Sequence, residues 1–271
     1  MESSAYYSLK TGLGDYDRLS ILNKYYNPGT RQLLHQAKIQ PSASVVDIGC
    51  GHGEVTFILS SEFVPKGNIL GVDADPKQIE VAKIKVDSLE NVSLLCNDIY
   101  TLDLPDESFD YLYCRCLLIH LPDPKAALAN MIKLLKPGGK LICEEVDVRG
   151  LRCVPEKKGF DRWMRYWFNL GRSLGVAYDF PDQMFQTLLD LNLKVKVFQI
   201  NQPVSWSQDA KALHVLGFQQ LVPLYLKKGG ATERDIEALQ QLYDDFLSEP
   251  KAYVELYRIN QFIAEKPIVY S

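Results

Sequence analysis

The chain has 271 residues, of which 46% are hydrophobic and 24% charged, enough for one large domain or one domain with a cap. Its net charge of −4 provides no overall attraction to nucleic acids or anionic membranes. No apolar run approaches the ~18 residues of a membrane-spanning helix, and a signal peptide is not expected. Six cysteines without a framework spacing indicate reduced thiols, so we expect a cytoplasmic protein.

The N-terminal segment, residues 1–39, is expected to form two helices. Apolar side chains recur at helical spacing from Leu19 to Tyr26, and Asn27-Pro28-Gly29 is expected to end this first helix. A second helix is expected over about 30–38.

A glycine turn between a strand and a helix is the most informative stretch. Ser44–Ile48 is a short apolar run with β-branched residues, which is typical of a buried parallel strand. Glycines follow at alternate positions, where they permit a sharp turn and the close approach of a ligand, and a helical pattern over 54–63 comes next. The turn is not a dinucleotide fingerprint, because Glu54 stands where the third glycine belongs. It is not a phosphate loop either, because no Gly-Lys-Ser/Thr follows.

The resulting pattern, D-x-G-x-G-x-G after a strand, resembles the first motif of the class I methyltransferases that use S-adenosylmethionine. The resemblance implies that the glycines pass beneath the methionine half of this cofactor. It also implies that Asp47 holds the ammonium group, directly or through the loop. The cofactor-binding residues implied in this turn are Asp47, Gly49, Cys50, Gly51 and Gly53. The alternative is a glycine turn that only joins a strand to a helix.

Two further strands each lead to an acidic residue. Asn68–Val72 precedes Asp73-Ala74, and Asp73 lies 20 residues after Gly53, where an acid at a strand tip can bind both ribose hydroxyls. Val92–Cys96 precedes Asn97-Asp98-Ile99. In the family that the chain resembles, an aspartate here binds the adenine amino group and the next apolar residue packs on the ring, which Asp98 and Ile99 match. The cofactor-binding residues predicted in these two places are Asp73, Ala74, Asn97, Asp98 and Ile99.

A fourth strand, expected over 109–113, leads into a loop with candidate polar residues. The sequence after it is similar to the family's fourth motif region, which implies that Arg115 contacts the methionine end of the cofactor. His120 is the first candidate for a general base, or it holds the loop by hydrogen bonds. Cys114-x-Cys116 with His120 lacks the ligand spacing of a zinc site, so no metal is expected.

A fifth strand over 140–146 completes a repeated alternation of strands and helices, after a helix that Lys136-Pro137-Gly138-Gly139 is expected to stop. Of Glu144, Glu145 and Asp147 near its end, at least one is expected to be an ordinary solvated charge. The alternation predicts an α/β fold with a doubly wound, mostly parallel sheet and ligands at the carboxyl ends of the strands. With the resemblance, we expect a seven-stranded Rossmann-like sheet that carries a helical cap.

Beyond Gly150 the resemblance is limited to topology. Helices are expected over 160–174, 183–191, 207–221 and 232–248, and strands over 193–200 and 262–270. The expected domains are an N-terminal helical lid (1–39), a cofactor-binding core (40–150), a cap helix with a later core strand (151–200), a helical cap (201–255) and a final core strand (256–271). The first of these is a lid by resemblance to other methyltransferases, or a pair of packing helices.

The expected helix over 160–174 carries aromatic side chains on one face and arginines on the other. Such a helix can cap a small-molecule pocket, or its basic and aromatic residues can bind nucleic acid. The separation of the two faces favours the pocket. His214, on the helix expected over 207–221, is the second candidate base, or a packed histidine of the cap.

These features predict an S-adenosylmethionine-dependent methyltransferase that acts on the O, N or C atom of a small aromatic or lipophilic acceptor. The fourth strand is not followed by the N/D-P-P-Y/F phrase of nucleic-acid amino methyltransferases, so nucleic acid is not the expected partner. A nucleic-acid or protein methyltransferase and a non-catalytic S-adenosylmethionine-binding module remain alternatives. No membrane partner is expected, and the oligomeric state, monomer or homodimer, stays open.

Overall fold

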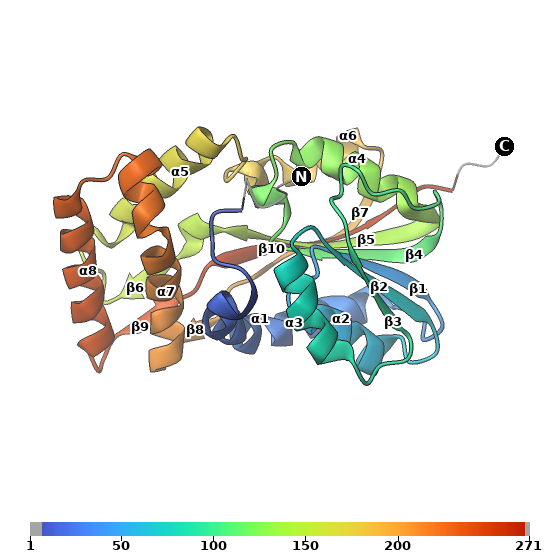
Figure 1. Cartoon of the computed structure of the whole chain (residues 1–271), viewed down its shortest axis with the longest axis horizontal. Coiled ribbons are helices and arrows are strands. Elements are labelled where there is room, and N and C mark those ends of the chain that lie inside the picture. The colour runs from blue at the N-terminus through green and yellow to red at the C-terminus, as the bar shows by residue number, and fades with distance from the viewer. Residues whose placement is uncertain (1–6, 269–271) are drawn as a thin grey trace.

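A computed structural model of the chain describes residues 7–268 and contains one large sheet between two layers of helices (Figure 1). The seven strands lie in the order β3-β2-β1-β4-β5-β10-β7. Their bounds are β1 Ser44–Ile48, β2 Asn68–Asp73, β3 Val92–Cys96, β4 Phe109–Arg115, β5 Leu135–Asp147, β7 Lys194–Asn201 and β10 Arg258–Glu265. The first five run parallel, whereas β10 is antiparallel to both β5 and β7. The predicted Rossmann-like, mostly parallel seven-stranded sheet is therefore confirmed.

Helices cover both faces of this sheet because each has one apolar stripe to bury. On one face lie α1 (Tyr16–Ala37) and α2 (Glu54–Ile58), and on the other lie α4 (Pro124–Leu134) and α6 (Met184–Asp190). A short π-helical turn, Leu59–Phe63, continues α2, and α3 (Pro76–Val86) connects β2 to β3. Asp75 and Asp123 accept hydrogen bonds from the first turns of α3 and α4, as their Asp-Pro sequences indicate.

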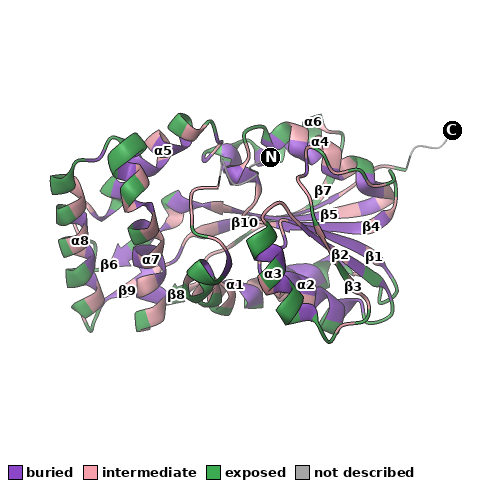
Figure 2. Cartoon of the chain, in the orientation of Figure 1, coloured by how far each residue is buried: buried purple, intermediate pink, exposed green. Residues whose placement is uncertain are grey.

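A further group of elements, called the cap below, lies beyond the carboxyl ends of the strands and has a hydrophobic core of its own. It contains α5 (Trp163–Leu174), α7 (Gln208–Leu224), α8 (Glu233–Ser248) and a small sheet of β6 (Arg152–Val154), β9 (Tyr253–Glu255) and β8 (Val204–Ser205). These elements lie together on the left of Figure 1 and enclose a cluster of buried aromatic side chains. Figure 2 shows the buried face of each of these helices turned inward and the exposed face turned outward. The expected helices over 160–174, 207–221 and 232–248 are thus present within a few residues, and the small sheet was not expected.

The N-terminal region differs from the expectation, because α1 is one continuous helix through Pro28. A proline inside a helix costs ~3 kcal/mol, mainly by removing one backbone hydrogen bond. Here the residues around it have strong tertiary contacts. Tyr26 donates its hydroxyl to the carbonyl of Tyr257, and Asn27 and Thr30 accept hydrogen bonds from Arg115. The expected break at Asn27-Pro28-Gly29 is therefore wrong.

The last core strand and the acids of β5 also differ from the expectation. The last strand begins at Arg258 and ends at Glu265, earlier than the expected 262–270, whose final residues 269 and 270 lie outside the described part. None of the three acids on β5 is a solvated charge, because Glu144, Glu145 and Asp147 are all buried. Each has partners from other elements, such as the Tyr113 hydroxyl that donates to Glu144.

Candidate active site

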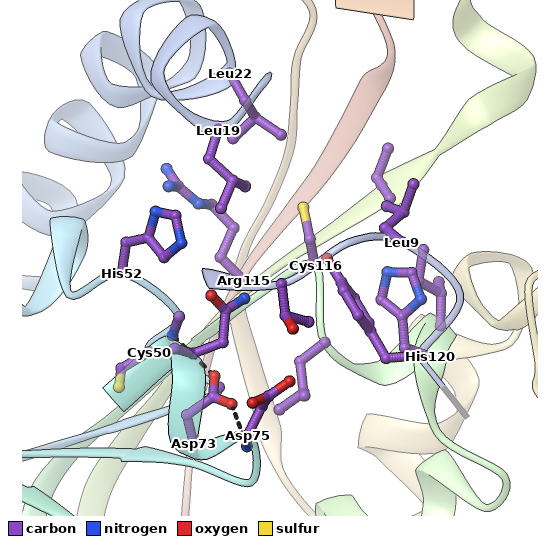
Figure 3. Close-up of a pocket in the computed structure, with 18 of the residues that line it drawn as sticks. Leu9, Leu19, Leu22, Cys50, His52, Asp73, Asp75, Arg115, Cys116 and His120 are labelled. Carbon is purple, nitrogen blue, oxygen red and sulfur yellow. Dashed lines mark hydrogen bonds between the residues drawn. The ribbon is translucent and has the colours of Figure 1, made fainter. Parts of the chain in front are cut away.

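A cavity of about 280 Å³ lies between the carboxyl ends of the sheet strands and the cap. Its walls come from the N-terminal segment and α1, from the glycine turn and the tips of β2, β3 and β4, and from α5 and α7. Figure 3 shows Asp73 and Asp75 at one end of it, and Leu9, Leu19 and Leu22 at the other. The cavity is therefore polar on the side of the strand tips and apolar on the side of α1 and the cap.

Asp73 connects the tip of β2 to the glycine turn (Figure 3). Its Oδ2 accepts a hydrogen bond of 2.9 Å from the amide of Gly51, and its Oδ1 accepts one of 2.9 Å from the amide of Asp75. Burial raises the pKa of Asp73, and the two amide donors act against this effect. The neighbouring Ala74 lines the cavity as well. The carboxylate thus holds the turn in place and still borders the cavity.

The glycines of the turn all have positive φ angles, which favour glycine, but they face different surroundings. Gly49 and Gly51 line the cavity together with Cys50. A Cβ atom on Gly51 would meet nothing within 4 Å, so this glycine leaves an open cradle. Gly53 is not among the lining residues, and a Cβ there would lie 3.2 Å from the Cβ of Ala82 on α3. The expectation that Gly53 contacts the cofactor is not supported, because this glycine serves the packing of α2 on α3.

Asp47, at the end of β1, borders the cavity from below the turn and is 2% exposed. It accepts a hydrogen bond of 2.6 Å from the Thr56 hydroxyl. Burial raises its pKa to about 6, against the lowering effects of Thr56 and of the Arg115 charge. A cation placed beside Asp47 would favour its ionised form.

The tip of β3 places Asn97, Asp98 and Ile99 on the same cavity wall as Asp73. The Asn97 amide donates to the backbone carbonyl of Asp73 over 3.1 Å. Asp98 accepts from the backbone amide of Tyr100 over 2.9 Å, and Ile99 is 7% exposed. The acids predicted at successive strand tips therefore lie together, as the parallel sheet requires.

The side chain of Arg115, at the end of β4, donates hydrogen bonds to three residues of α1. It donates to Asn23 over 2.7 Å, to Asn27 over 2.8 Å and to Thr30 over 3.2 Å. Within residues 7–268 it has no carboxylate within salt-bridge distance. Its neutral partners leave a partly buried positive charge in the cavity wall, which an anionic group could balance.

The two candidate bases, His120 and His214, both line the cavity and are both nearly completely buried. Tyr7 and Tyr178 pack edge-on against the His120 ring, at 4.7 Å and 5.9 Å between centroids. The Nδ1 atom of His120 has no hydrogen-bond partner among the described residues. His214 shares a hydrogen bond of 2.7 Å with the Tyr257 hydroxyl. Burial lowers the pKa of each imidazole to about 3, so both are neutral near pH 7.

Several cavity residues were not foreseen from the sequence. They are Tyr7, Arg18, His52 and Tyr257, whereas Trp163 and Trp167 lie on the aromatic face of the helix that was expected to cap the pocket. Arg18 precedes Leu22 and Tyr26 by four and eight residues, so the helical spacing could have placed it on the same face. No sequence signal indicated Tyr257, which approaches His214 only through the tertiary fold. In the described part of the chain, no group of three or more His, Cys, Asp or Glu side chains could hold a metal ion.

Comparison with known proteins identifies the family. Residues 39–211 match the family described as "Methyltransferase domain". The chain belongs to this methyltransferase family. A demethylmenaquinone methyltransferase of Staphylococcus aureus is 33% identical over 132 residues, which are 48% of this chain and 55% of the relative. The chain thus spans about half the length of the curated relatives that it matches.

Solved structures support the fold at lower sequence identity. The YcgJ protein of Bacillus subtilis superposes with a TM-score of 0.57 at 18% identity, over 87% of this chain and 97% of that one. A phosphoethanolamine N-methyltransferase 2 of Haemonchus contortus in complex with S-adenosyl-L-methionine has a TM-score of 0.53 at 17% identity, over 97% and 56%. The predicted family, S-adenosylmethionine-dependent methyltransferases with a Rossmann-like sheet, is confirmed. None of the described helices is long and apolar enough to cross a membrane.

Proposed function

We propose that the protein transfers a methyl group from S-adenosylmethionine to a small aromatic or lipophilic acceptor. The observation that carries this proposal is a single cavity that joins the acidic strand tips to an apolar, aromatic chamber. The first half offers partners for a nucleoside and an amino acid, and the second half is lined mainly by apolar and aromatic side chains. The Staphylococcus aureus relative is named for demethylmenaquinone, an acceptor of this lipophilic class.

The residues at the polar end fit S-adenosylmethionine. Asp73 would bind the ribose hydroxyls, Asp98 the adenine amino group, and Ile99 would pack on the ring. Asp47 and Arg115, which are of opposite charge, line the cavity together with Gly49 and Gly51 and could pair with the ammonium and carboxylate of the methionine part. The cofactor supplies an electrophilic methyl group when it is bound, so the protein's main contribution is the positioning of an acceptor, which can amount to ~7–11 kcal/mol.

The apolar end suits a flat or hydrophobic acceptor. Tyr26, Trp163, Trp167, Phe218 and Tyr225 line it, together with leucines of α1 and α7. Aromatic walls of this kind bury a large apolar area and exclude water. An acceptor hydroxyl would need a base, and we propose His120 for that role with His214 as the second candidate. Both imidazoles are neutral and so have a free lone pair, but the burial that lowers their pKa also makes them weaker bases than a solvated histidine.

The arginine face of α5 does not favour nucleic acid as the acceptor. Arg162, Arg165 and Arg172 are exposed, whereas Trp163 and Trp167 point into the cavity. Stacking of bases needs aromatic rings on the same surface as the cations, so this face is better explained as the solvated side of a cap helix. All six cysteines are free thiols, which supports a reducing compartment such as the cytoplasm.

The proposed domain division follows from the same arrangement. Residues 1–39 would close over the cavity as a lid, 40–150 would bind the cofactor, and 201–255 together with the cap helix of 151–200 would enclose the acceptor. The final core strand of 256–271 would contribute Tyr257 to the cavity wall. Because β6 pairs with β9, residues 152–154 and 253–255 join the two parts of the cap.

Calorimetry and a transfer assay test the proposal together. We expect S-adenosylmethionine and S-adenosylhomocysteine to bind, and labelled methyl to appear on at least one member of a panel of phenols, hydroquinones and amines. No heat with either ligand, together with binding of NAD, would reject the proposal. Cofactor binding without transfer to any member of a broad panel would instead indicate a non-catalytic binding module.

A further inference from the structure

Arg18, near the start of α1, places a cation in the wall of the cavity. Its side chain is 11% exposed and lines the cavity beside Leu19 and Leu22, whose positions Figure 3 shows. The proposed function does not use this residue, because Arg115 lies beside the glycine turn where the methionine part would bind. A buried guanidinium in an apolar chamber is costly unless it has a partner or a task.

Asp15 holds the guanidinium of Arg18 in one orientation. Arg18 donates from Nε to Oδ1 of Asp15 over 2.8 Å and from Nη2 to Oδ2 of the same carboxylate. Gln220 on α7 donates to Oδ1 of Asp15 over 2.7 Å, which anchors the carboxylate from a second helix. Among residues 7–268, no acceptor faces Nη1 of Arg18. One edge of the guanidinium is therefore fixed, and the other keeps its donors for a ligand.

The titratable groups around Arg18, apart from Asp15, are neutral near pH 7. They are Tyr7, His52, Cys116, His120 and Tyr257, whose pKa values all respond to the Arg18 charge. Burial raises the pKa of Tyr7 and of Cys116 to about 12, and raises that of Tyr257 as well. Burial and the Arg18 charge lower the pKa of His120 to about 3, and burial lowers that of His52.

We infer that the acceptor carries an acidic oxygen, of a phenol, enol or carboxylic acid, which binds to the free edge of Arg18 as an anion. The inference rests on the proposed function and specifies its substrate class. A purely hydrocarbon acceptor would leave buried donors of Arg18 without a partner. The free edge of Arg18 offers donors and no acceptor, so an ammonium group would find no hydrogen-bond partner there, whereas an oxyanion would.

The test uses 4-nitrophenol, whose ionisation is visible in its absorbance, and needs no turnover. We expect the wild-type protein to bind nitrophenolate and to lower the pKa of the bound phenol. Arg18→Met should weaken nitrophenolate binding about 10- to 100-fold, as the loss of a charge-assisted hydrogen bond implies. Arg18→Lys should restore part of the affinity. Arg165→Met, on the exposed face of α5, is the matched control and should bind like the wild type.

Two further measurements keep the inference testable if Arg18→Met does not fold. The wild-type protein should bind nitrophenolate at least about tenfold more tightly than 4-nitrotoluene, which has the same shape and no charge. Asp15→Asn should tighten nitrophenolate binding, because the Arg18 charge then loses its carboxylate partner. Equal affinity for the charged and neutral probes would overturn the inference.

Calorimetry with S-adenosylmethionine separates this inference from the proposed function. Arg18→Met should keep the affinity of the wild type for S-adenosylmethionine. A loss of tenfold or more in that affinity would assign Arg18 to the cofactor's carboxylate and overturn the acceptor class. If S-adenosylmethionine does not bind the wild type, the proposed function fails, whereas the nitrophenolate result still shows whether Arg18 binds an oxyanion.

Discussion

Asp73→Asn is the most direct test of the cofactor end of the cavity. In the wild type the two carboxylate oxygens accept from the amides of Gly51 and Asp75, each over 2.9 Å. Asparagine keeps one acceptor oxygen and turns an NH₂ group toward the other amide. One of the two hydrogen bonds is therefore lost, together with the negative charge that would face the ribose.

The magnitude follows from these losses. Hydrogen bonds to charged groups contribute ~1.5–3 kcal/mol, and neutral ones about half as much. We expect Asp73→Asn to raise the dissociation constant for S-adenosylhomocysteine roughly 10- to 100-fold, because 1.4 kcal/mol corresponds to a factor of ten. The free energy of unfolding should fall by ~1–3 kcal/mol, the cost of one unsatisfied buried donor.

Titration calorimetry with S-adenosylhomocysteine and chemical denaturation measure the two effects. Asp123→Asn is the matched control, because Asp123 caps α4, is exposed and lies outside the cavity. Asparagine caps a helix about as well as aspartate, so this variant should lose only the ~0.3–1 kcal/mol that a negative charge contributes at a helix N-terminus, and none of the affinity. A folded Asp73→Asn variant with unchanged affinity would refute the assignment of Asp73 to the ribose.

Three more predictions concern the glycine turn, the buried Glu145 on β5 and the candidate base His120. Gly51→Ala should weaken S-adenosylhomocysteine binding, because its Cβ would occupy the open cradle, whereas Gly53→Ala should mainly lower the melting temperature, because its Cβ would press on Ala82. Both substitutions also strain a positive φ, so only the ratio of the two effects distinguishes them, and equal losses of affinity would contradict the assignment. Burial raises the pKa of Glu145 to about 7 from the usual 4.5, so its contribution to stability is present below pH 4.5 and is lost as the pH rises through 7. Glu145→Gln should remove this part of the pH dependence of unfolding, and identical slopes in the two proteins would exclude it. His120→Ala should lower turnover more than cofactor affinity in a steady-state assay, and unchanged turnover would remove His120 as the base.

Local signals in the sequence were sufficient to predict the residues at the end of the cavity that we propose binds the cofactor. The apolar run that contains Asp47 and the one that ends at Asp73 mark buried parallel strands, and alternate glycines mark the turn between strand and helix. The carboxyl ends of parallel strands meet at one edge of a sheet, so acids at successive strand tips converge without any further information. The structure places Asp73 and Asp98 on one cavity wall, as this reasoning requires.

The sequence could not decide features that depend on contacts between distant residues. The continuity of α1 through Pro28 depends on partners on β4 and on Tyr257, more than 80 residues away. The burial of Glu144 depends on donors from three other elements, and the small sheet pairs strands about 100 residues apart. The spacing of residues along the chain does not indicate which distant residues will be in contact.

Local sequence therefore determined most strands and helices of the large sheet and its covering layers, and hence the fold, the family and the convergence of acids at the strand tips. Only the tertiary structure decided that Gly53 faces α3, that His214 meets Tyr257, and that Asp15 holds Arg18 in an apolar chamber. The physical reason is that hydrophobic periodicity and glycine conformation act over a few residues. Which side chains of α1, α5 and α7 line the cavity, and which charges they bring to it, is decided only when these helices pack together.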